Sequence, residues 1–396
     1  MPATPLRVLL CANQFGSVPN GPAKFAVLLL EMQRAAAGRS DVHFAVLTED
    51  RTPSPVDGPE VFYVNVPAKK YLPQAALQLV RARAYQRRAA ELNTGAFPFD
   101  VLLFNNVTNA IGLSADRPYR VVGMLNDYNN LEPDFFQRYG KLTYWSRRAL
   151  HVLERRAAHT ADMVVAISEF LREKIITIYD LPAGRVTKLY KAVDMEGISY
   201  RERTLPHPGE RVRVLYVKTN YQRGGLPVLL TALGSLSDRQ FELCVVGSGK
   251  EFLTFYQAKH GQLPENVELV LSGRQPQEVV FSHMREVDIF CVPALTEALG
   301  VANIEAMAHG LPVVTSDAGG IPEVTLAGKH AWTAPAGDAA GLAAAFRGCL
   351  ANPEETLAKA SSARTFVENN FSRAAAYRNF SRLLHAAAQQ NELTTA

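Results

Sequence analysis

Short apolar runs alternate with helical patterns along most of the chain, and this alternation limits the folds open to it. The first run, Val8–Cys11, precedes a helical pattern near residues 22–37, and a second run follows near residues 43–47. The same order returns with three further strand-like runs at 101–104, 121–125 and 163–167. An order of β-α-β-α predicts parallel sheets that are covered by helices on both faces.

The alternation stops once, in a polar segment at 199–209 that has no periodicity and contains Pro206 and Pro208. It then restarts with strand-like runs at 212–217, 241–246, 267–271, 287–292 and 312–315. A chain of 396 residues is also too long for one ordinary core. We therefore predict an α/β protein with two Rossmann-like, doubly wound domains at 1–200 and 201–375. A helix at 376–396 ends the chain and could pack back on the N-terminal domain.

The composition is typical of a soluble globular protein. Apolar residues make up 47% and charged residues 20% of the chain, and no apolar run approaches the roughly 20 residues of a membrane span. No basic and apolar leader opens the sequence, so we expect a cytoplasmic protein without a signal peptide. A net charge of +4 is too small for a nucleic-acid binder, which usually carries a basic stripe. Without metal-pair spacing, four cysteines are expected to be buried, reduced thiols: Cys11, Cys244, Cys291 and Cys349.

The most informative segment is 293–324, which reads PALTEALGVANIEAMAHGLPVVTSDAGGIPEV. Glu297 and Gly300 follow a strand, and a short helix behind Gly300 carries Glu305. Ligands of parallel sheets bind beyond the carboxyl ends of the strands, and a helix start offers unpaired N–H groups to a diphosphate. The two carboxylates could bond the hydroxyls of a transferred sugar and of a ribose. A loop Glu and a solvated helix Glu without a role are the simpler alternative.

The same segment resembles the retaining glycosyltransferases of family 4, which have the two-domain GT-B fold. That family carries two Glu residues separated by seven positions, within the runs P-S-x-x-E-x-x-G and G-x-P-V-V-x-x-x-x-G-G-x-x-E. The matching positions here are Pro293, Glu297, Gly300, Glu305, Gly310, Pro312, Val313, Val314, Gly319, Gly320 and Glu323. The stretches 161–170, 241–249, 287–290 and 371–372 also resemble family segments.

The resemblance implies a set of donor contacts. Glu297 would contact the donor sugar, Glu305 the ribose, and the backbone amides near Gly300 and Val301 the donor phosphates. We place further donor contacts at Leu299, Thr219, Gly247, Gly273 and Arg274.

The loop after the run at 212–217 departs from the family pattern. Relatives clamp the diphosphate with an Arg and a Lys, but Thr219 and Gly224 stand at those positions here. Lys218 and Arg223 each lie one residue earlier. Two cations near the end of a strand still suit a leaving diphosphate, and we predict this catalytic role for them. Solvated cations on a loop surface are the alternative.

The N-terminal half offers a second loop. The family has a Gly-Gly pair here that approaches the donor phosphate and the acceptor; Gly21 matches one position and Pro22 replaces the other. We predict an acceptor and phosphate loop that includes Asn20, Gly21 and Lys24. The segment also fits an ordinary helix start, with a cap followed by proline.

The run at 121–125 ends in Asn126-Asp127, where many relatives have His-Asp beside the donor sugar. Asn126 cannot act as a base but can hydrogen-bond a sugar hydroxyl. Asp127 is then the nearest carboxylate, and a helix cap is an equally good interpretation of it.

Basic residues gather at Lys69-Lys70-Tyr71 and along 77–92, where apolar residues alternate with Arg81, Arg83, Arg87 and Arg88. Such a patch could lie against an anionic membrane at the inner face, although a solvated helix face is the simpler interpretation.

Taken together, these features predict a retaining hexosyltransferase that uses a UDP- or GDP-linked sugar donor and needs no metal or other cofactor. The acceptor would be a glycan, a lipid-linked glycan or a small metabolite, held by the N-terminal half, and nucleic acid would not be a partner. The chain has no G-x-G-x-x-G, P-loop or Asp-x-Asp sequence, which argues against dehydrogenases, P-loop NTPases and metal-using single-domain transferases. The alternatives are a non-catalytic partner of another glycosyltransferase, or a nucleotide-sugar epimerase or hydrolase on the same fold.

Overall fold

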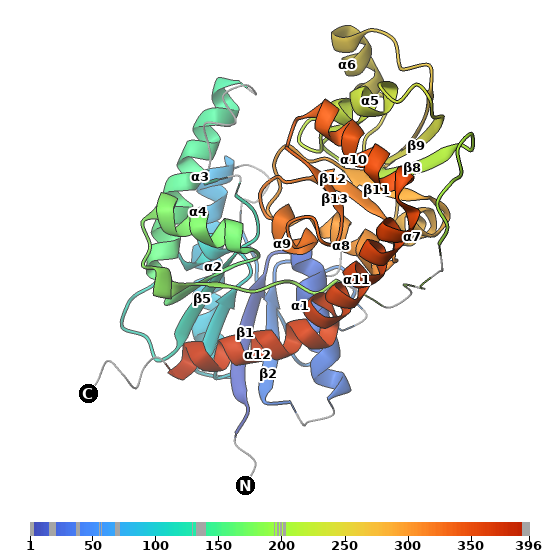
Figure 1. Cartoon of the computed structure of the whole chain (residues 1–396). Coiled ribbons are helices and arrows are strands. Elements are labelled where there is room, and N and C mark those ends of the chain that lie inside the picture. Colours follow the sequence, from blue (N-terminus) through green and yellow to red (C-terminus); the bar gives the residue numbers. More distant parts are fainter. Residues whose placement is uncertain are drawn as a thin grey trace. The chain divides into compact units, whose positions relative to one another are not determined.

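The computed structural model divides the chain into two compact units (Figure 1). The first unit comprises Met1–Ala192 and Arg373–Ala396, and the second comprises Val193–Ser372. The boundary thus falls a few residues before the end of the domain that we expected at 1–200. The structure describes residues 4–15, 21–36, 40–54, 56, 58–67, 72–128, 130–131, 140–193, 195, 198, 200 and 203–389.

The first unit is built on a parallel sheet. Its described residues form seven strands in the order β3-β2-β1-β4-β5-β6-β7. The strands are β1 (Leu6–Ala12), β2 (Val42–Thr48), β3 (Val61–Tyr63), β4 (Val101–Phe104), β5 (Arg120–Leu125), β6 (Met163–Ala166) and β7 (Val186–Lys188). The chain winds outward from β1 in one direction and from β4 in the other, which makes the sheet doubly wound, as predicted. Strands β1 and β4 are almost wholly buried because helices cover both faces of the sheet.

Helices and short 3-10 turns connect these strands: α1 (Gly21–Ala35), α2 (Gln74–Asn93), η1 (Val107–Ala110), α3 (Lys141–Thr160), α4 (Glu169–Tyr179) and η3 (Ala183–Arg185). The last helix of the chain, α12 (Arg373–Gln389), also packs in this unit, against α1 (Figure 1). Its Phe380 ring lies 5.2 Å from the ring of Phe25 and 5.9 Å from that of Phe44. The C-terminal helix therefore supplies part of the first unit's core.

The second unit repeats the plan. Within its described residues, six parallel strands form a sheet in the order β10-β9-β8-β11-β12-β13. The strands are β8 (Val212–Val217), β9 (Phe241–Val246), β10 (Val267–Gly273), β11 (Ile289–Val292), β12 (Val313–Ser316) and β13 (Trp332–Ala334). The helices are α5 (Leu226–Gly234), α6 (Glu251–His260), α7 (Gln277–Glu286), α8 (Val301–Ala308), α9 (Ile321–Thr325), α10 (Ala339–Ala351) and α11 (Pro353–Phe371). Here the winding reverses between β8 and β11.

Most strands lie where the apolar runs predict them, and the differences have local causes. The run at 287–292 forms a strand only from Ile289, because Val287 still caps α7 and its amide bonds the His283 carbonyl. The last helix, predicted from residue 376, begins at Arg373, because Ser372 adopts an extended conformation between α11 and α12. All four cysteines are free and buried, as predicted.

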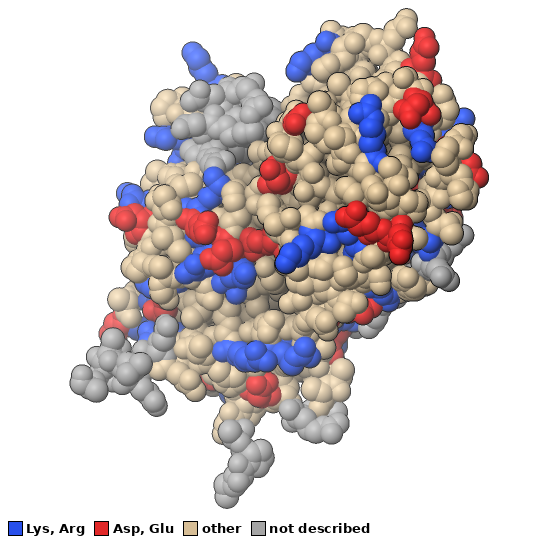
Figure 2. Space-filling view, in the orientation of Figure 1, with Lys and Arg blue, Asp and Glu red and all other residues tan. Residues whose placement is uncertain are grey.

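The surface carries both signs of charge. On the face shown in Figure 2, the described basic and acidic side chains are interspersed rather than gathered by sign. No helix in the described part of the chain is both long and apolar enough to cross a bilayer.

Candidate functional site

The winding of the second unit places two loops side by side. Strands β8 and β11 pair in parallel, with Leu215 opposite Phe290, so the loops that follow them leave the same edge of the sheet. These are the loops that carry Lys218 and Glu297. In open α/β sheets the crevice at such a reversal of strand order is where ligands bind.

Lys218 and Glu297 meet across this reversal point. The Lys218 ammonium forms a hydrogen-bonded ion pair with Glu297 Oε2, and both side chains keep a part of their surface exposed. Glu297 Oε1 accepts a hydrogen bond from the Ala298 amide at 3.1 Å. The backbone carbonyl of Glu297 accepts from the Gly320 amide at 3.1 Å, which fixes the loop against the start of α9. A cation and a carboxylate thus stand together at the expected ligand position.

Arg223 ties the same two loops together. Its amide donates to Asn220 Oδ1 at 2.9 Å, which closes the turn after β8. Its guanidinium Nε donates to Thr296 Oγ1 at 3.1 Å, and its carbonyl accepts from the Leu295 amide at 2.8 Å. Arg223 therefore bridges the loops, and its role is at least partly to hold the loop that carries Glu297.

Gly247 allows β9 to end close against this loop. Its φ is +103°, and a Cβ at this position would lie 2.7 Å from both the carbonyl carbon and the oxygen of Lys218. The next residue, Ser248, is buried and donates to the Lys218 carbonyl at 3.0 Å. Thr219, which takes the family's Arg position, is exposed beside them. The backbone around Lys218 is therefore held by a contact that only glycine permits.

The helix α8 begins behind Gly300, which adopts a left-handed conformation with φ +97°. No side chain caps the helix start. The first amides of α8 are therefore a suitable seat for an anion. Val301 is 46% exposed here, whereas the Leu299 side chain is buried in the core, so only the backbone of Leu299 could contact a donor.

Glu305 lies one turn after Val301, on the exposed side of α8. It is half-buried, and its Oε1 accepts from Gln277 Nε2 at 3.2 Å. Gln277 begins α7, so this bond joins α8 to the loop that contains Gly273 and Arg274. Gly273 accepts from the Gly247 amide at 2.6 Å, and Arg274 is exposed. The donor residues expected from the sequence thus follow four neighbouring strands along one edge.

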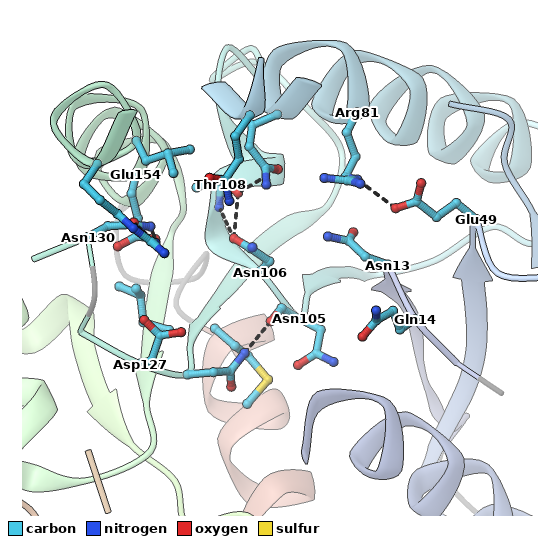
Figure 3. Close-up of a pocket in the computed structure, with 17 residues that line it drawn as sticks. Asn13, Gln14, Glu49, Arg81, Asn105, Asn106, Thr108, Asp127, Asn130 and Glu154 are labelled. Carbon is cyan, nitrogen blue, oxygen red and sulfur yellow. Dashed lines mark hydrogen bonds and ion pairs between the residues drawn. The ribbon is translucent and has the colours of Figure 1, made fainter. Parts of the chain in front are cut away.

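The first unit has a pocket of about 420 Å³ at the corresponding edge of its own sheet (Figure 3). Its polar lining includes Asn13, Gln14, Glu49, Arg81, Asn105, Asn106, Thr108, Asp127, Asn130 and Glu154. Three of the contributing segments follow the adjacent strands β1, β4 and β5, at the point where the strand order reverses. Amide and carboxylate groups dominate the lining, and these groups suit hydrogen bonds to hydroxyls.

Asn126 and Asp127 line this pocket. Asn126 Nδ2 donates to the Asn105 carbonyl at 2.7 Å, which fixes the side chain between two strand ends. Among the described residues, no group donates to its buried Oδ1, so an acceptor is left in the pocket wall. Asp127 is exposed at the rim.

The prediction for Arg81 was wrong. We assigned it to an exposed basic patch, but it is buried and its Nε bonds Glu49 Oε1 at 2.7 Å inside the pocket (Figure 3). The physical reason is helical periodicity, because Arg81 shares the buried face of α2 with Tyr85, Ala89 and Leu92. Arg83 and Arg87 are exposed, whereas Lys69, Lys70 and Tyr71 lie outside the described residues.

Glu154 is the most perturbed carboxyl of the pocket. It lies on α3, is only 5% exposed, and accepts from Tyr179 Oη at 2.7 Å and from Asn130 Nδ2 at 2.8 Å. Burial raises its pKa to about 7, against the two hydrogen bonds, which lower it. Burial and the neighbouring Glu154 also raise the pKa of Tyr179.

The remaining predicted residues of the first unit are only partly described. Asn20 lies outside the described residues, Gly21 begins α1, and Lys24 is exposed on its first turn. Among the described residues, no three His, Cys, Asp or Glu side chains lie close enough together to hold a metal ion.

Sequence reasoning missed Gln277 and Thr296 in the second unit and most of the pocket in the first. A signal was present for some of the pocket residues, since Asn13 and Asn105 directly follow buried strands. Glu49 carries the same signal, because it directly follows β2, whereas no local signal marks Asn130 or Glu154, and Glu154 reaches the pocket from α3.

Comparisons with known proteins agree with this architecture. The glycosyl transferases group 1 model matches residues 201–366, and the glycosyl transferase 4-like domain matches residues 20–190. The amylovoran biosynthesis glycosyltransferase AmsK of Erwinia amylovora is 32% identical over 254 residues, which cover 60% of this chain and 61% of AmsK. The alignments with this and other curated relatives span about 37–61% of those proteins.

Two solved structures share the fold. Sucrose-phosphate synthase from Thermosynechococcus elongatus superposes with a TM-score of 0.71 at 18% identity, over 96% of this chain and 98% of that one. Anabaena HepE in complex with UDP and glucose gives a TM-score of 0.67 at 18% identity, over 96% of this chain and 100% of that one. With both domain models matched in order and both sheets doubly wound, the chain belongs to the family 4 type of glycosyltransferases, which have the GT-B fold.

Proposed function

We propose that this chain is a retaining glycosyltransferase that moves a sugar from a nucleoside-diphosphate donor to a hydroxyl group. The observation that carries this proposal is the Lys218–Glu297 pair at the reversal point of the second sheet, beside the uncapped start of α8. A cation and helix N–H groups suit a leaving diphosphate, and a carboxylate suits the hydroxyls of a sugar. The UDP and glucose in the HepE structure support a UDP-linked donor, and a GDP-linked donor is the alternative.

The donor would bind in the second unit and the acceptor in the pocket of the first. Glu305 would bond the ribose, and the amides of Gly300 and Val301 would face the phosphates. The many amide groups of the pocket support an acceptor hydroxyl on a glycan, and the relation to an amylovoran glycosyltransferase supports a polysaccharide product. We also propose that the protein works at the cytoplasmic side and without a metal ion.

In the proposed reaction, the acceptor oxygen forms a bond to the anomeric carbon on the face from which the diphosphate leaves. The bond between that carbon and the phosphate oxygen breaks, and its electron pair stays on the phosphate. The same phosphate takes the proton of the acceptor hydroxyl. Lys218 would stabilise the developing charge, while Glu297 would hold the sugar and, by its ion pair, the position of Lys218.

The first test is a thermal-shift screen with UDP, GDP, ADP and their sugars, because a ligand stabilises the state that binds it. A selective shift names the donor, and a labelled donor with product analysis then separates transfer from hydrolysis or epimerisation. The absence of a shift with every nucleotide would contradict the proposal.

Variants test the roles of the residues. We expect Lys218→Ala and Glu297→Gln to lower kcat by about 100-fold or more, because each removes a group that acts mainly in the transition state. Lys329→Ala and Glu265→Gln are matched controls, since both side chains are exposed elsewhere in the second unit. Equal turnover by all four variants would refute the assignments of Lys218 and Glu297.

Glu305→Ala tests the ribose contact separately. We expect a weaker affinity for the nucleoside diphosphate by about tenfold, because one charge-assisted hydrogen bond is lost. The measurement is calorimetric titration with the diphosphate that the screen selects. An unchanged dissociation constant would place the ribose elsewhere.

A further inference from the structure

Helix α3 has two faces of different character. Its inner face contributes Leu150 and Glu154 to the pocket. Its outer face exposes 86% of Leu142, 64% of Trp145 and 47% of Val152. These three residues follow one stripe at helical spacing, because they are three and seven positions apart. Large apolar side chains gathered on one exposed stripe mark a surface that meets a partner.

The charges of α3 indicate which partner. The helix has five cationic residues and one carboxylate, and this carboxylate, Glu154, is buried in the pocket. Lys141, Arg148 and Arg156 are exposed beside the apolar stripe. A helical face that combines aromatic and aliphatic groups with lysine and arginine is typical of helices that lie in the headgroup region of an anionic bilayer.

Helix α2, where the sequence placed a membrane patch, is a weaker candidate. Its Arg81 is buried, and Glu91 pairs with Arg87 at 3.5 Å and with Arg88 at 2.9 Å. Its only exposed large apolar residue among the described ones is Leu79, at 37%. The charge of α2 is thus partly neutralised and its apolar contribution is small. Helix α3 also extends beyond the sheet of the first unit (Figure 1).

We propose that the outer face of α3 docks on an anionic lipid bilayer. Leu142 and Trp145 enter the headgroup region, while Lys141, Arg148 and Arg156 contact lipid phosphates. The docked helix holds the pocket on its other face beside the membrane, where a lipid-linked acceptor presents its sugar. This last step rests on the proposed transferase function, whereas the docking itself does not.

The test is cosedimentation with vesicles of phosphatidylglycerol and phosphatidylcholine in equal parts, against vesicles of phosphatidylcholine alone. We expect binding to the anionic vesicles only, and loss of binding when NaCl is raised to about 1 M, where charges are screened beyond about 3 Å. Leu142→Glu combined with Trp145→Glu should weaken the partition coefficient at least about tenfold. Equal binding to both kinds of vesicle, or binding that survives this double variant, would overturn the proposal.

Two matched pairs of charge reversals locate the surface. Arg148→Glu with Arg156→Glu changes the net charge as much as Arg83→Glu with Arg87→Glu does, so long-range attraction falls equally in both. We expect the variant with both α3 reversals to bind anionic vesicles about fivefold or more weakly than the variant with both α2 reversals. The reason is that the α3 charges touch the lipid. Equal loss in both pairs, or a larger loss in the α2 pair, would refute docking through α3.

Tryptophan fluorescence gives a second measurement. The chain has two tryptophans, Trp145 and Trp332, and the latter lies in the second unit. The emission should shift to the blue when anionic vesicles are added, and Trp145→Phe should abolish the shift. A shift that persists in this variant would contradict the insertion of Trp145. If no vesicle binds while a soluble acceptor is still glycosylated, the docking proposal fails and the transferase proposal stands.

Discussion

The pKa of Glu154 predicts how the stability of the first unit depends on pH. Burial raises this pKa from 4.5 to about 7 in the folded chain. Each pKa unit corresponds to about 1.4 kcal/mol, so ionisation of the buried carboxyl costs the folded state roughly 3 kcal/mol. Because the folded pKa is the higher one, the folded state binds the proton more tightly. The contribution of Glu154 to the unfolding free energy is therefore complete below pH 4.5, falls as pH rises to about 7, and is constant above it.

Glu154→Gln removes this titration and keeps the shape of the side chain. The free-energy difference between the variant and the native chain should change by about 3 kcal/mol between acidic and alkaline pH, in favour of the variant at high pH. The pKa of about 7 already includes the hydrogen bonds from Tyr179 and Asn130, which lower it, so the change of about 3 kcal/mol is the net effect of ionisation.

Urea unfolding at pH values on both sides of the window measures the effect. Trp332→Phe leaves Trp145 as the fluorescent reporter, and this residue belongs to the first unit. Glu91→Gln is the control, because Glu91 is exposed on α2 and Arg88 lowers its pKa, so its removal cannot give a gain at high pH. A difference between Glu154→Gln and the native chain that stays constant with pH would refute the reasoning.

Two further substitutions test a close backbone contact at Gly247 and the buried ion pair of Arg81. Gly247→Ala should lower the stability of the second unit by roughly 2 kcal/mol or more in thermal melts, because the added Cβ would lie 2.7 Å from the Lys218 backbone. Gly209→Ala is the control: its φ is also positive but the space around it is open, so it should cost only about 1 kcal/mol. Arg81→Met should cost about 3 kcal/mol in urea unfolding, because it leaves Glu49 charged and buried, and adding Glu49→Gln should restore part of the loss. Equal melting points for the two glycine variants, or no rescue by the second change, would contradict these contacts.

The sequence predicts the architecture well where apolar runs are long. The strands β8 and β9 have the predicted bounds, since each ends in a run of four apolar residues, which suits a strand buried on both faces. The three-residue strands β3 and β13 could not be predicted, because pairing with β2 and β12 holds them in place. The last helix begins at Arg373, three residues before the start predicted at 376.

The site was only partly predictable. The positions of Glu297 and Lys218 follow from their places after strands, but their ion pair depends on which strands are neighbours. The burial of Arg81 could have been inferred from its spacing to Tyr85 and Ala89, which is that of one helix face. The raised pKa of Glu154 could not, because it depends on side chains from three separate segments.

The return of α12 to the first unit has a practical consequence. A recombinant fragment ending at residue 192 would lack Phe380 and Leu384, leaving the rings of Phe25 and Phe44 without their cover. Such a fragment should be insoluble or molten, and a synthetic peptide spanning 373–389 should rescue it in trans. By contrast, the second unit, 193–372, is one continuous stretch and can be excised with two cuts, so that nucleotide binding can be assayed on that piece alone once its folding is verified.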